Sequence, residues 1–196
     1  MALILDMGVR GNGGEILHPQ MKNKWRLTFN GIGGASVVDS QALTFQAITC
    51  DRPKLSFEKV TLDRYNSRAY VAGKHQFDPI NVTFEADIGG NVASVIQRQL
   101  EQQQRIIGMS AAPRLPSALA GQEYKFSITQ EILDGDNTPI EVWYIEGAWI
   151  ENTDYTDLDY AASETIKIQL TISYDHARQE ILGLPGRATG GMAPTI

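Results

Sequence analysis

The stretch NSRAYVAGKHQFDPINVTFEAD, residues 66–87, decides the fold of this chain of 196 residues. In its second half, apolar side chains recur at every second position: Ile80, Val82, Phe84 and Ala86. This alternation is typical of a β-strand with one buried face. Pro79 limits the start of the strand, because proline has no N–H to donate. The charged first half is predicted to be a long connection between two strands, longer than a two-residue hairpin turn.

The segment before this stretch, KLSFEKVTL, also alternates, but its apolar positions shift from Leu55 and Phe57 to Val60 and Leu62. A shift of this kind usually marks a β-bulge or the end of strand pairing. Nearer the N-terminus, two further strands are predicted from alternating apolar residues, with a glycine turn (GIGG, 31–34) between them: Trp25, Leu27 and Phe29, then Leu43, Phe45 and Ala47.

One helix is predicted after residues 88–91 (IGGN), with Asn91 as its N-cap. Its apolar positions follow helical spacing: Val92, Val95, Ile96, Leu100 and Ile107. The opposite face is polar and includes Gln97, Glu101 and Gln102. A helix with one such polar face packs on one side of a sheet.

The remainder of the chain is predicted to be β-structure. Strands are expected around 124–129, 140–149 and 166–174, with a turn at 134–137 (DGDN). The fold class is mainly β, an antiparallel β-sandwich or partly closed barrel of about seven strands with one flanking α-helix. We expect a single domain over 23–180, flanked by glycine-containing flexible arms at 1–22 and 181–196.

Composition excludes several classes of function. The chain has 17 Lys and Arg against 23 Asp and Glu, a formal net charge of −6, which disfavours tight binding to nucleic acid. Cys50 is the only cysteine, so no intrachain disulfide can form and a reducing compartment is expected. The start, MALILDMG, is too short an apolar run for a signal peptide, and no segment has the apolar length of a membrane span.

No motif predicts catalysis. His18, His75 and His176 lie far apart, and surface roles are favoured over a pairing of His75 with a nearby aspartate. Cys50 has no evident base partner, so it is predicted to be structural. Glu58 and Glu85 flank the quoted connection, and we do not expect them to form an acid–base pair.

Neither a metal nor a cofactor is predicted. The acidic stretch ENTDYTDLDY contains Asp154, Asp157 and Asp159, and calcium binding is an alternative there because calcium prefers clustered oxygen ligands. The EF-hand spacing is absent, so a solvated loop is favoured. The glycine pairs at 31–34 and 88–91 lack the spacing of phosphate-binding loops, and turns explain both.

From Trp25 to His176 the chain resembles the tail tube proteins of contractile-tailed bacteriophages. The segments that carry the resemblance occur in this order: CDRPKLSFEKV, RYNSRAYVAG, QFDPINVTFEAD, the Gln-rich helix, VWYIEGAWIEN and LDYAASETIKIQLTISYD. Baseplate tube initiators and the tube proteins of type VI secretion share this fold. The resemblance implies a non-enzymatic virion protein of the tail, assembled in the host cytoplasm.

The resemblance also implies hexameric rings whose inner strands merge into one barrel, stacked into a hollow tube through which DNA passes during ejection without specific binding. The implied partners are further copies of this chain, the tail sheath, the baseplate and a tail terminator. Physical chemistry agrees, because an open sheet edge is satisfied by pairing with a neighbour and an acidic chain repels phosphate.

Three groups of residues are given roles in this assembly. The hairpin residues expected to contact the next ring are Arg64, Tyr65, Arg68, Tyr70 and Lys74. The residues expected to face the lumen are Glu58, Thr83 and Glu85, and the outward helix face carries Gln97, Glu101 and Gln102.

Two other classes of function remain open. A monomeric small-ligand-binding β-sandwich would use the strand that carries Trp143 and Trp149. An enzyme, for example a hydrolase using His75 and an aspartate, has weaker support. Within the tube class, a baseplate tube initiator or a secretion-system tube protein is the alternative to a main tube protein.

Overall fold

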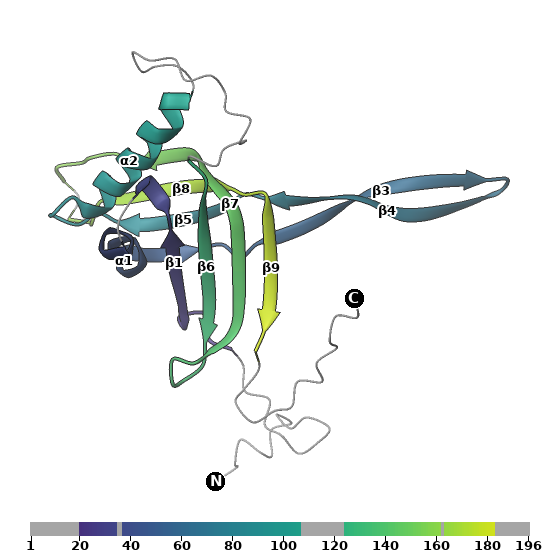
Figure 1. Ribbon diagram of the computed structural model, residues 1–196, viewed down its shortest axis with the longest axis horizontal. Helices are drawn as coiled ribbons and strands as arrows, with labels where there is room; N and C mark the ends of the chain where they lie inside the picture. Colours follow the sequence, from purple (N-terminus) through teal and green to yellow (C-terminus); the bar gives the residue numbers. More distant parts are fainter. Residues whose placement is uncertain (1–19, 35–36, 107–123, 162, 183–196) are drawn as a thin grey trace, which may run out of the picture.

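The computed structural model describes residues 20–34, 37–106, 124–161 and 163–182, and its elements are drawn in Figure 1. The predictions for His18, for Ile107 and for most of the two arms lie outside these residues. The helical elements are a 3₁₀ turn η2 (Ile32–Gly34), α1 (Val37–Gln46) and α2 (Asn91–Ile106). The strands are β1 (Trp25–Asn30), β2 (Ala47–Cys50), β3 (Lys54–Arg64), β4 (Ser67–Asp78), β5 (Ile80–Glu85), β6 (Phe126–Leu133), β7 (Pro139–Tyr155), β8 (Lys167–Ser173) and β9 (His176–Ile181).

Seven of these strands form one antiparallel sheet with two halves. One half contains β1, β6, the first part of β7 and β9, and the other contains the last part of β7, β8, β5 and β2. In Figure 1, β1, β6 and β9 run roughly vertically, whereas β5 and β8 run across them. The two halves therefore pack as layers of a sandwich that share one long strand.

Strand β7 changes from one half to the other at Gly147. Its pairing with β9 ends at Glu146, and its pairing with β8 begins at Trp149. Gly147 has φ +68°, and a Cβ there would collide with the carboxylate of Asp175. Only glycine fits this conformation and this close approach.

The core lies between the two halves and under α2. Phe29 of β1 and Phe84 of β5 meet across it with ring centroids 5.8 Å apart. The predicted apolar positions of β5 and β8 are buried: Ile80, Val82, Phe84, Ile168, Leu170 and Ile172. Helix α2 adds Val92, Val95 and Ile96. The alternation and the helical spacing seen in the sequence are thus confirmed.

The prediction of a second strand through Leu43 and Phe45 is wrong. These residues lie in α1, where Leu43 is buried and Phe45 is exposed, and β2 begins only at Ala47. Alternation over three apolar residues does not distinguish a strand from a short helix, because Leu43 and Ala47 also satisfy the helical spacing of four. The described residues contain two α-helices, so the prediction of one flanking helix is corrected.

The prediction of a long connection before β5 is also wrong. Residues 54–78 form a β-hairpin whose strands β3 and β4 pair from Lys54–Asp78 to Arg64–Ser67, leaving a two-residue turn, Tyr65–Asn66. Tyr65 has φ +46°, as the first position of a tight hairpin turn requires. The parity shift does coincide with a bulge, where Glu58 of β3 faces two residues of β4, Gly73 and Lys74.

The start of α2 is capped by a residue other than the one predicted. Asp87 accepts hydrogen bonds from the backbone N–H groups of Asn91 (3.2 Å) and Val92 (3.2 Å), and Asn91 donates its own side-chain amide to the same carboxylate (2.7 Å). Asp87 therefore does the capping predicted for Asn91. These bonds lower the pKa of Asp87 below its usual range, the bond from Val92 contributing most.

The fold class is confirmed as mainly β and antiparallel, but the described strands do not close into a barrel. Nine strands are present in the described part of the chain, two more than the sequence predicted. None of the described helices has the length and apolar character needed to cross a membrane.

Candidate assembly surfaces

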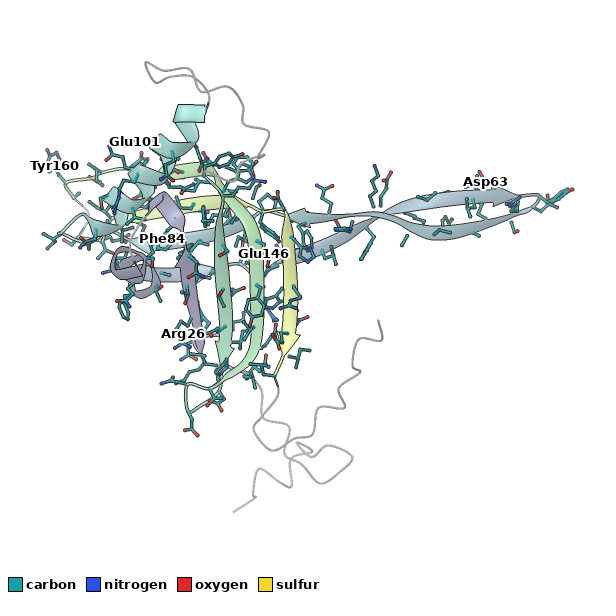
Figure 2. All side chains as sticks on the ribbon, viewed as in Figure 1. Arg26, Asp63, Phe84, Glu101, Glu146 and Tyr160 are labelled. Carbon is teal, nitrogen blue, oxygen red and sulfur yellow. The ribbon has the colours of Figure 1, made fainter. Side chains whose placement is uncertain are left out.

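The β3–β4 hairpin is the most exposed part of the described structure. It forms a sheet of its own and projects from the sandwich along the longest axis of the molecule (Figure 1). Asp63 lies near its tip in Figure 2. Every residue of β3 is exposed, as are the five predicted contact residues Arg64, Tyr65, Arg68, Tyr70 and Lys74. The structure therefore brings these five residues together on one protruding element.

The tip of the hairpin has two different faces. Because side chains alternate along each strand, Val60, Leu62 and Val71 lie on one face. The other face is charged: Arg68 pairs with Asp63 at 2.9 Å, and the Lys59 ammonium lies 3.6 Å from the centre of the Tyr70 ring. Exposed ion pairs of this kind add little stability, so the charges remain available to a partner.

Nearer the body, the apolar residues lie on the opposite face. Leu55 and Phe57 of β3 face Phe77 and His75 of β4, and alternation along β3 places them on the same side as Lys59. The bulge at Glu58 separates the two regions. Apolar surface is thus presented in one direction at the root of the hairpin and in another at its tip.

Aromatic contacts attach the root of the hairpin to the sandwich. Phe77 lies 5.5 Å from Tyr174 and 5.8 Å from His176, and His75 lies 5.6 Å from Phe77 (centroid distances). His75 and His176 are therefore placed in this aromatic group. Burial raises the pKa of the Tyr174 hydroxyl, and the charge of Asp78 acts in the same direction.

An ion pair fixes the segment that leads into the hairpin. Arg52, just before β3, contacts the carboxylate of Glu141 on β7. Glu141 is only 7% exposed and accepts further hydrogen bonds from the Trp143 indole (2.5 Å) and the Gln179 amide (2.9 Å). A buried carboxylate needs such donors, so this cluster sets where the hairpin leaves the sandwich. The sequence does not reveal this cluster, since Arg52 and Glu141 are 89 positions apart.

The outer face of the second half-sheet is polar. Thr83 and Glu85 point away from the core, because Val82 and Phe84 between them are buried. Glu85 lies opposite Lys167 in the register of β5 and β8. Glu58 lies on the hairpin, so the structure groups Thr83 with Glu85 and leaves Glu58 apart.

Hydrogen bonds connect the polar groups on this face. The Thr171 hydroxyl donates to the Asn81 side-chain oxygen (3.0 Å), whose amide donates to Asp51 (3.0 Å). The Ser173 hydroxyl donates to Glu151 (2.5 Å). The face therefore presents hydroxyl, amide and carboxylate groups that are held in place by one another.

Three residues of α2 are predicted for an outward face, and two of them are exposed. Gln97 and Glu101 are exposed and joined by a hydrogen bond of 3.1 Å, and Gln102 is half-buried.

A neighbouring row of the same helix was missed in the sequence. Gln99 is completely buried, accepts a hydrogen bond from the Gly33 N–H (2.7 Å) and donates to the Tyr124 carbonyl (2.6 Å). Gln103 accepts from the Ile150 N–H (3.2 Å) and donates to the Ile150 carbonyl (2.9 Å). Both side-chain amides bond to backbone N–H and C=O groups that no neighbouring strand satisfies. Gln103 in this way covers part of the outer edge of β7.

Other edges of the sheet remain uncovered by a strand. Within the described residues, β2 pairs only with β5, and β9 pairs only with β7. The side chains of β9 are exposed except for Ala177. An unpaired edge offers backbone donors and acceptors to a further strand.

The candidate metal ligands and the single cysteine of the sequence can be located in the fold. No cluster of three or more His, Cys, Asp or Glu able to hold a metal occurs in the part of the chain that the structure describes. Burial raises the pKa of the Cys50 thiol to about 12, and the neighbouring charge of Asp51 adds to the effect. A thiol with that pKa is protonated at neutral pH and is a poor nucleophile.

Comparison with known proteins gives one sequence relative and several structural ones. No protein-family model matches the chain. The tail tube protein of Serratia phage KSP90 is 21% identical over 159 residues, which cover 81% of this chain and 85% of that protein. The resemblance to phage tail tube proteins is confirmed.

Solved structures agree on the fold. A chain in the cryo-EM structure of the anti-feeding prophage baseplate superimposes with a TM-score of 0.60 at 11% identity, covering 85% of this chain and 99% of that one. A chain in the extended sheath–tube complex of an extracellular contractile injection system, PVC, gives a TM-score of 0.55 at 12% identity, covering 84% and 93%. The fold is therefore one that occurs in contractile injection systems.

Proposed function

We propose that this protein is the structural subunit of a phage tail tube. Hexameric rings of the chain stack into a hollow conduit, and DNA passes through the conduit during ejection. The observation that carries the proposal is the β3–β4 hairpin, which exposes large apolar side chains along its length and pairs with no other strand of the described subunit. Such a surface is typical of a protein–protein contact.

Two kinds of self-contact are needed for stacked rings, because one contact closes each ring and another repeats along the axis. The open edges at β2 and β9 are suited to the first contact, since a neighbouring sheet can pair with them. The hairpin is suited to the second contact, and Arg64, Tyr65, Arg68, Tyr70 and Lys74 are its proposed residues. Arginine and tyrosine are enriched among residues that dominate interface energy.

The polar half-sheet face is the proposed lining of the lumen, with Thr83 and Glu85 on it. Its hydroxyl, amide and carboxylate groups hydrogen-bond to one another, and Lys167 lies opposite Glu85. A face of this kind offers phosphate groups few fixed cations to bind, so DNA slides along it. The lumen role of Glu58, on the separate hairpin, stays a prediction from the sequence alone.

The outward face of α2, with Gln97, Glu101 and Gln102, is proposed to face the tail sheath. Baseplate and terminator proteins are the proposed partners at the two ends of the tube. The assembly would form in the host cytoplasm and reside in the virion tail. The structural likeness to a chain of an injection-system baseplate supports a tube initiator as the second candidate within the same class.

The experiment that tests the proposal is negative-stain electron microscopy of the purified chain at high concentration, with size-exclusion chromatography beside it. We expect rings or tubes. A protein that stays monomeric at every concentration and ionic strength, and binds a small ligand in a closed pocket, would refute it.

The hairpin assignment has its own test within that experiment. Arg64→Glu with Arg68→Glu should give folded subunits that do not stack, because the cationic side chains at the tip are reversed. Lys22→Glu with Lys24→Glu changes the net charge equally at the start of β1 and should leave tubes intact. Tubes of normal length from the hairpin variant would exclude the assignment.

The lumen assignment is tested separately in assembled tails. Glu85→Lys should leave tube assembly unchanged and slow the ejection of DNA, because the added cation binds phosphate. An unchanged ejection rate would remove Glu85 from the lumen.

A further inference from the structure

The loop between β7 and β8 forms a second unusual surface, which we call the acidic groove and define by residues 156–161 and 163–167. Leu158 is 80% exposed, and Tyr160 and Ile166 are also exposed. Three carboxylates, Asp157, Asp159 and Glu164, accompany them, and no cation occurs between 156 and 166. These side chains line a hollow of about 550 Å³. Exposed apolar groups gathered around a hollow are typical of a contact site for another protein.

Hydrogen bonds hold the neck of the acidic groove. The Thr156 hydroxyl donates to the Lys167 carbonyl (2.9 Å) and accepts from the Lys167 N–H (3.2 Å). The Ile166 carbonyl accepts from the Ala86 N–H (2.9 Å), which ties the loop to the end of β5. The Asp159 carboxylate accepts from the Ala161 N–H (3.0 Å). The groove is thus anchored to the sheet at both ends.

The acidic groove and the hairpin tip lie at opposite ends of the molecule. In Figure 2, Tyr160 is at one end of the longest axis and Asp63, near the hairpin tip, is at the other. A contact between two patches at opposite ends of a subunit is heterologous, and it repeats along one direction when its rotation does not close into a ring. This is the geometry that stacking along a tube axis needs.

The two surfaces are complementary in charge and in apolar character. The hairpin, residues 54–78, carries five Lys and Arg against three Asp and Glu, whereas the acidic groove lacks Lys and Arg up to Ile166. The tip offers Val60, Leu62 and Val71 on one face, all exposed. Opposite charges at the rim of an apolar contact raise the association rate and fix its register.

We propose that the acidic groove is the receptor for the hairpin tip of a second copy of this chain in the next ring. This inference rests on the proposed function and names the acceptor surface that the stacking contact uses. Arg64, on the same face of the tip as Val60 and Leu62, faces Asp157 and Asp159 while that face covers Leu158 and Tyr160. Arg68, on the opposite face, approaches the rim of the groove. Salt weakens the charged part of the contact and leaves the apolar part.

A charge exchange in purified protein tests the proposal. Asp157→Arg with Asp159→Arg should reduce the fraction of subunits in tubes at least about tenfold. A tenfold change corresponds to about 1.4 kcal/mol in the free energy of the contact. Arg64→Asp with Arg68→Asp should do the same. The chain that carries all four substitutions should form tubes again, because donor and acceptor charges are both reversed.

A matched control uses acidic residues outside the groove. Asp136→Arg with Glu146→Arg makes the same change in net charge at the β6–β7 turn and at an exposed position of β7, and should assemble as the unmodified chain does. Circular dichroism of each variant checks that the subunits are folded. Leu158→Ser with Tyr160→Ser tests the apolar part without any change of charge and should shorten the tubes.

The outcomes separate this inference from the proposed function. If the unmodified chain forms no rings or tubes, the proposed function fails. If the unmodified chain forms tubes and the acidic-groove variant forms them equally well, the groove is not the receptor. The same conclusion follows if the fourfold variant stays unassembled while both double variants are folded.

Discussion

Replacing the buried Gln99 by glutamate is the sharpest test of the packing between α2 and the sheet. The amide of Gln99 donates to the Tyr124 carbonyl and accepts from the Gly33 N–H. An ionised carboxylate can keep the second bond but would face the Tyr124 carbonyl oxygen without a proton to donate. Since Gln99 is completely buried, Gln99→Glu also places a charge in the core.

The cost of protonating the new carboxyl group sets an upper limit on the destabilisation by Gln99→Glu. Protonation removes the charge and restores a donor, and it costs about 1.4 kcal/mol for each pH unit above an ordinary glutamate pKa of about 4.3. The destabilisation is therefore limited to about 4 kcal/mol at pH 7 and to about 1 kcal/mol at pH 5. The folded-state pKa of Glu at this position is raised, so stability is present at low pH and decreases as pH rises.

Thermal unfolding of the unassembled subunit, followed by circular dichroism, measures this effect. At about 2–4 °C for each kcal/mol in a chain of this size, Gln99→Glu should lower Tm by about 8–16 °C at pH 7 and by much less at pH 5. Gln97→Glu, on the exposed face of the same helix, is the control and should change Tm by no more than about 2 °C. Equal Tm values for the two variants at pH 7 would refute the reasoning.

Three further predictions concern other residues. Gly147→Ala should destabilise the subunit by about 1–3 kcal/mol in urea unfolding, because of its positive φ and the collision at its Cβ, whereas Gly135→Ala, which meets open space, should have little effect. Cys50, with a pKa of about 12, should react with a thiol reagent at pH 8 at least about 100-fold more slowly in the folded protein than in denaturant, and equal rates would contradict its burial. Asp87 has a lowered pKa in the folded state, so its contribution to stability is present above its ordinary pKa of about 4 and is lost as pH falls further. Asp87→Asn should remove this part of the acid dependence of unfolding. An unchanged acid transition would mean that the hydrogen bond from the Val92 N–H is unimportant.

The parts of the fold that the sequence predicts are those with a long repeating pattern. The alternation in β5 and β8 and the helical spacing in α2 each extend over several residues, and burial follows them closely. The pattern from Leu43 to Ala47 is too short to distinguish a helix from a strand, so it predicts a strand where α1 lies. In the hairpin, the charged residues of β4 conceal a strand, because neither face is buried and no alternation is required.

Some residues of the candidate surfaces can be predicted from the sequence, and others cannot. The cationic and aromatic residues of the hairpin are recognisable from their sequence because they lie within one short segment. The cluster around Glu141 joins residues from β7, β9 and the β2–β3 connection, and only the folded chain brings them together. Gln99 looks the same in the sequence as the exposed Gln97, and its burial depends on where Gly33 and Tyr124 lie.

The shared strand β7 also gives the subunit a mechanical property. Force applied to the hairpin enters β2 and β5 through the backbone and also reaches β7 through the ion pair of Arg52 and Glu141. β7 continues by covalent bonds from one half-sheet into the other. The two layers of the sandwich therefore cannot be pulled apart by breaking side-chain packing alone, because a peptide backbone crosses between them at Gly147. A subunit built in this way resists shear between its layers while its neighbours move.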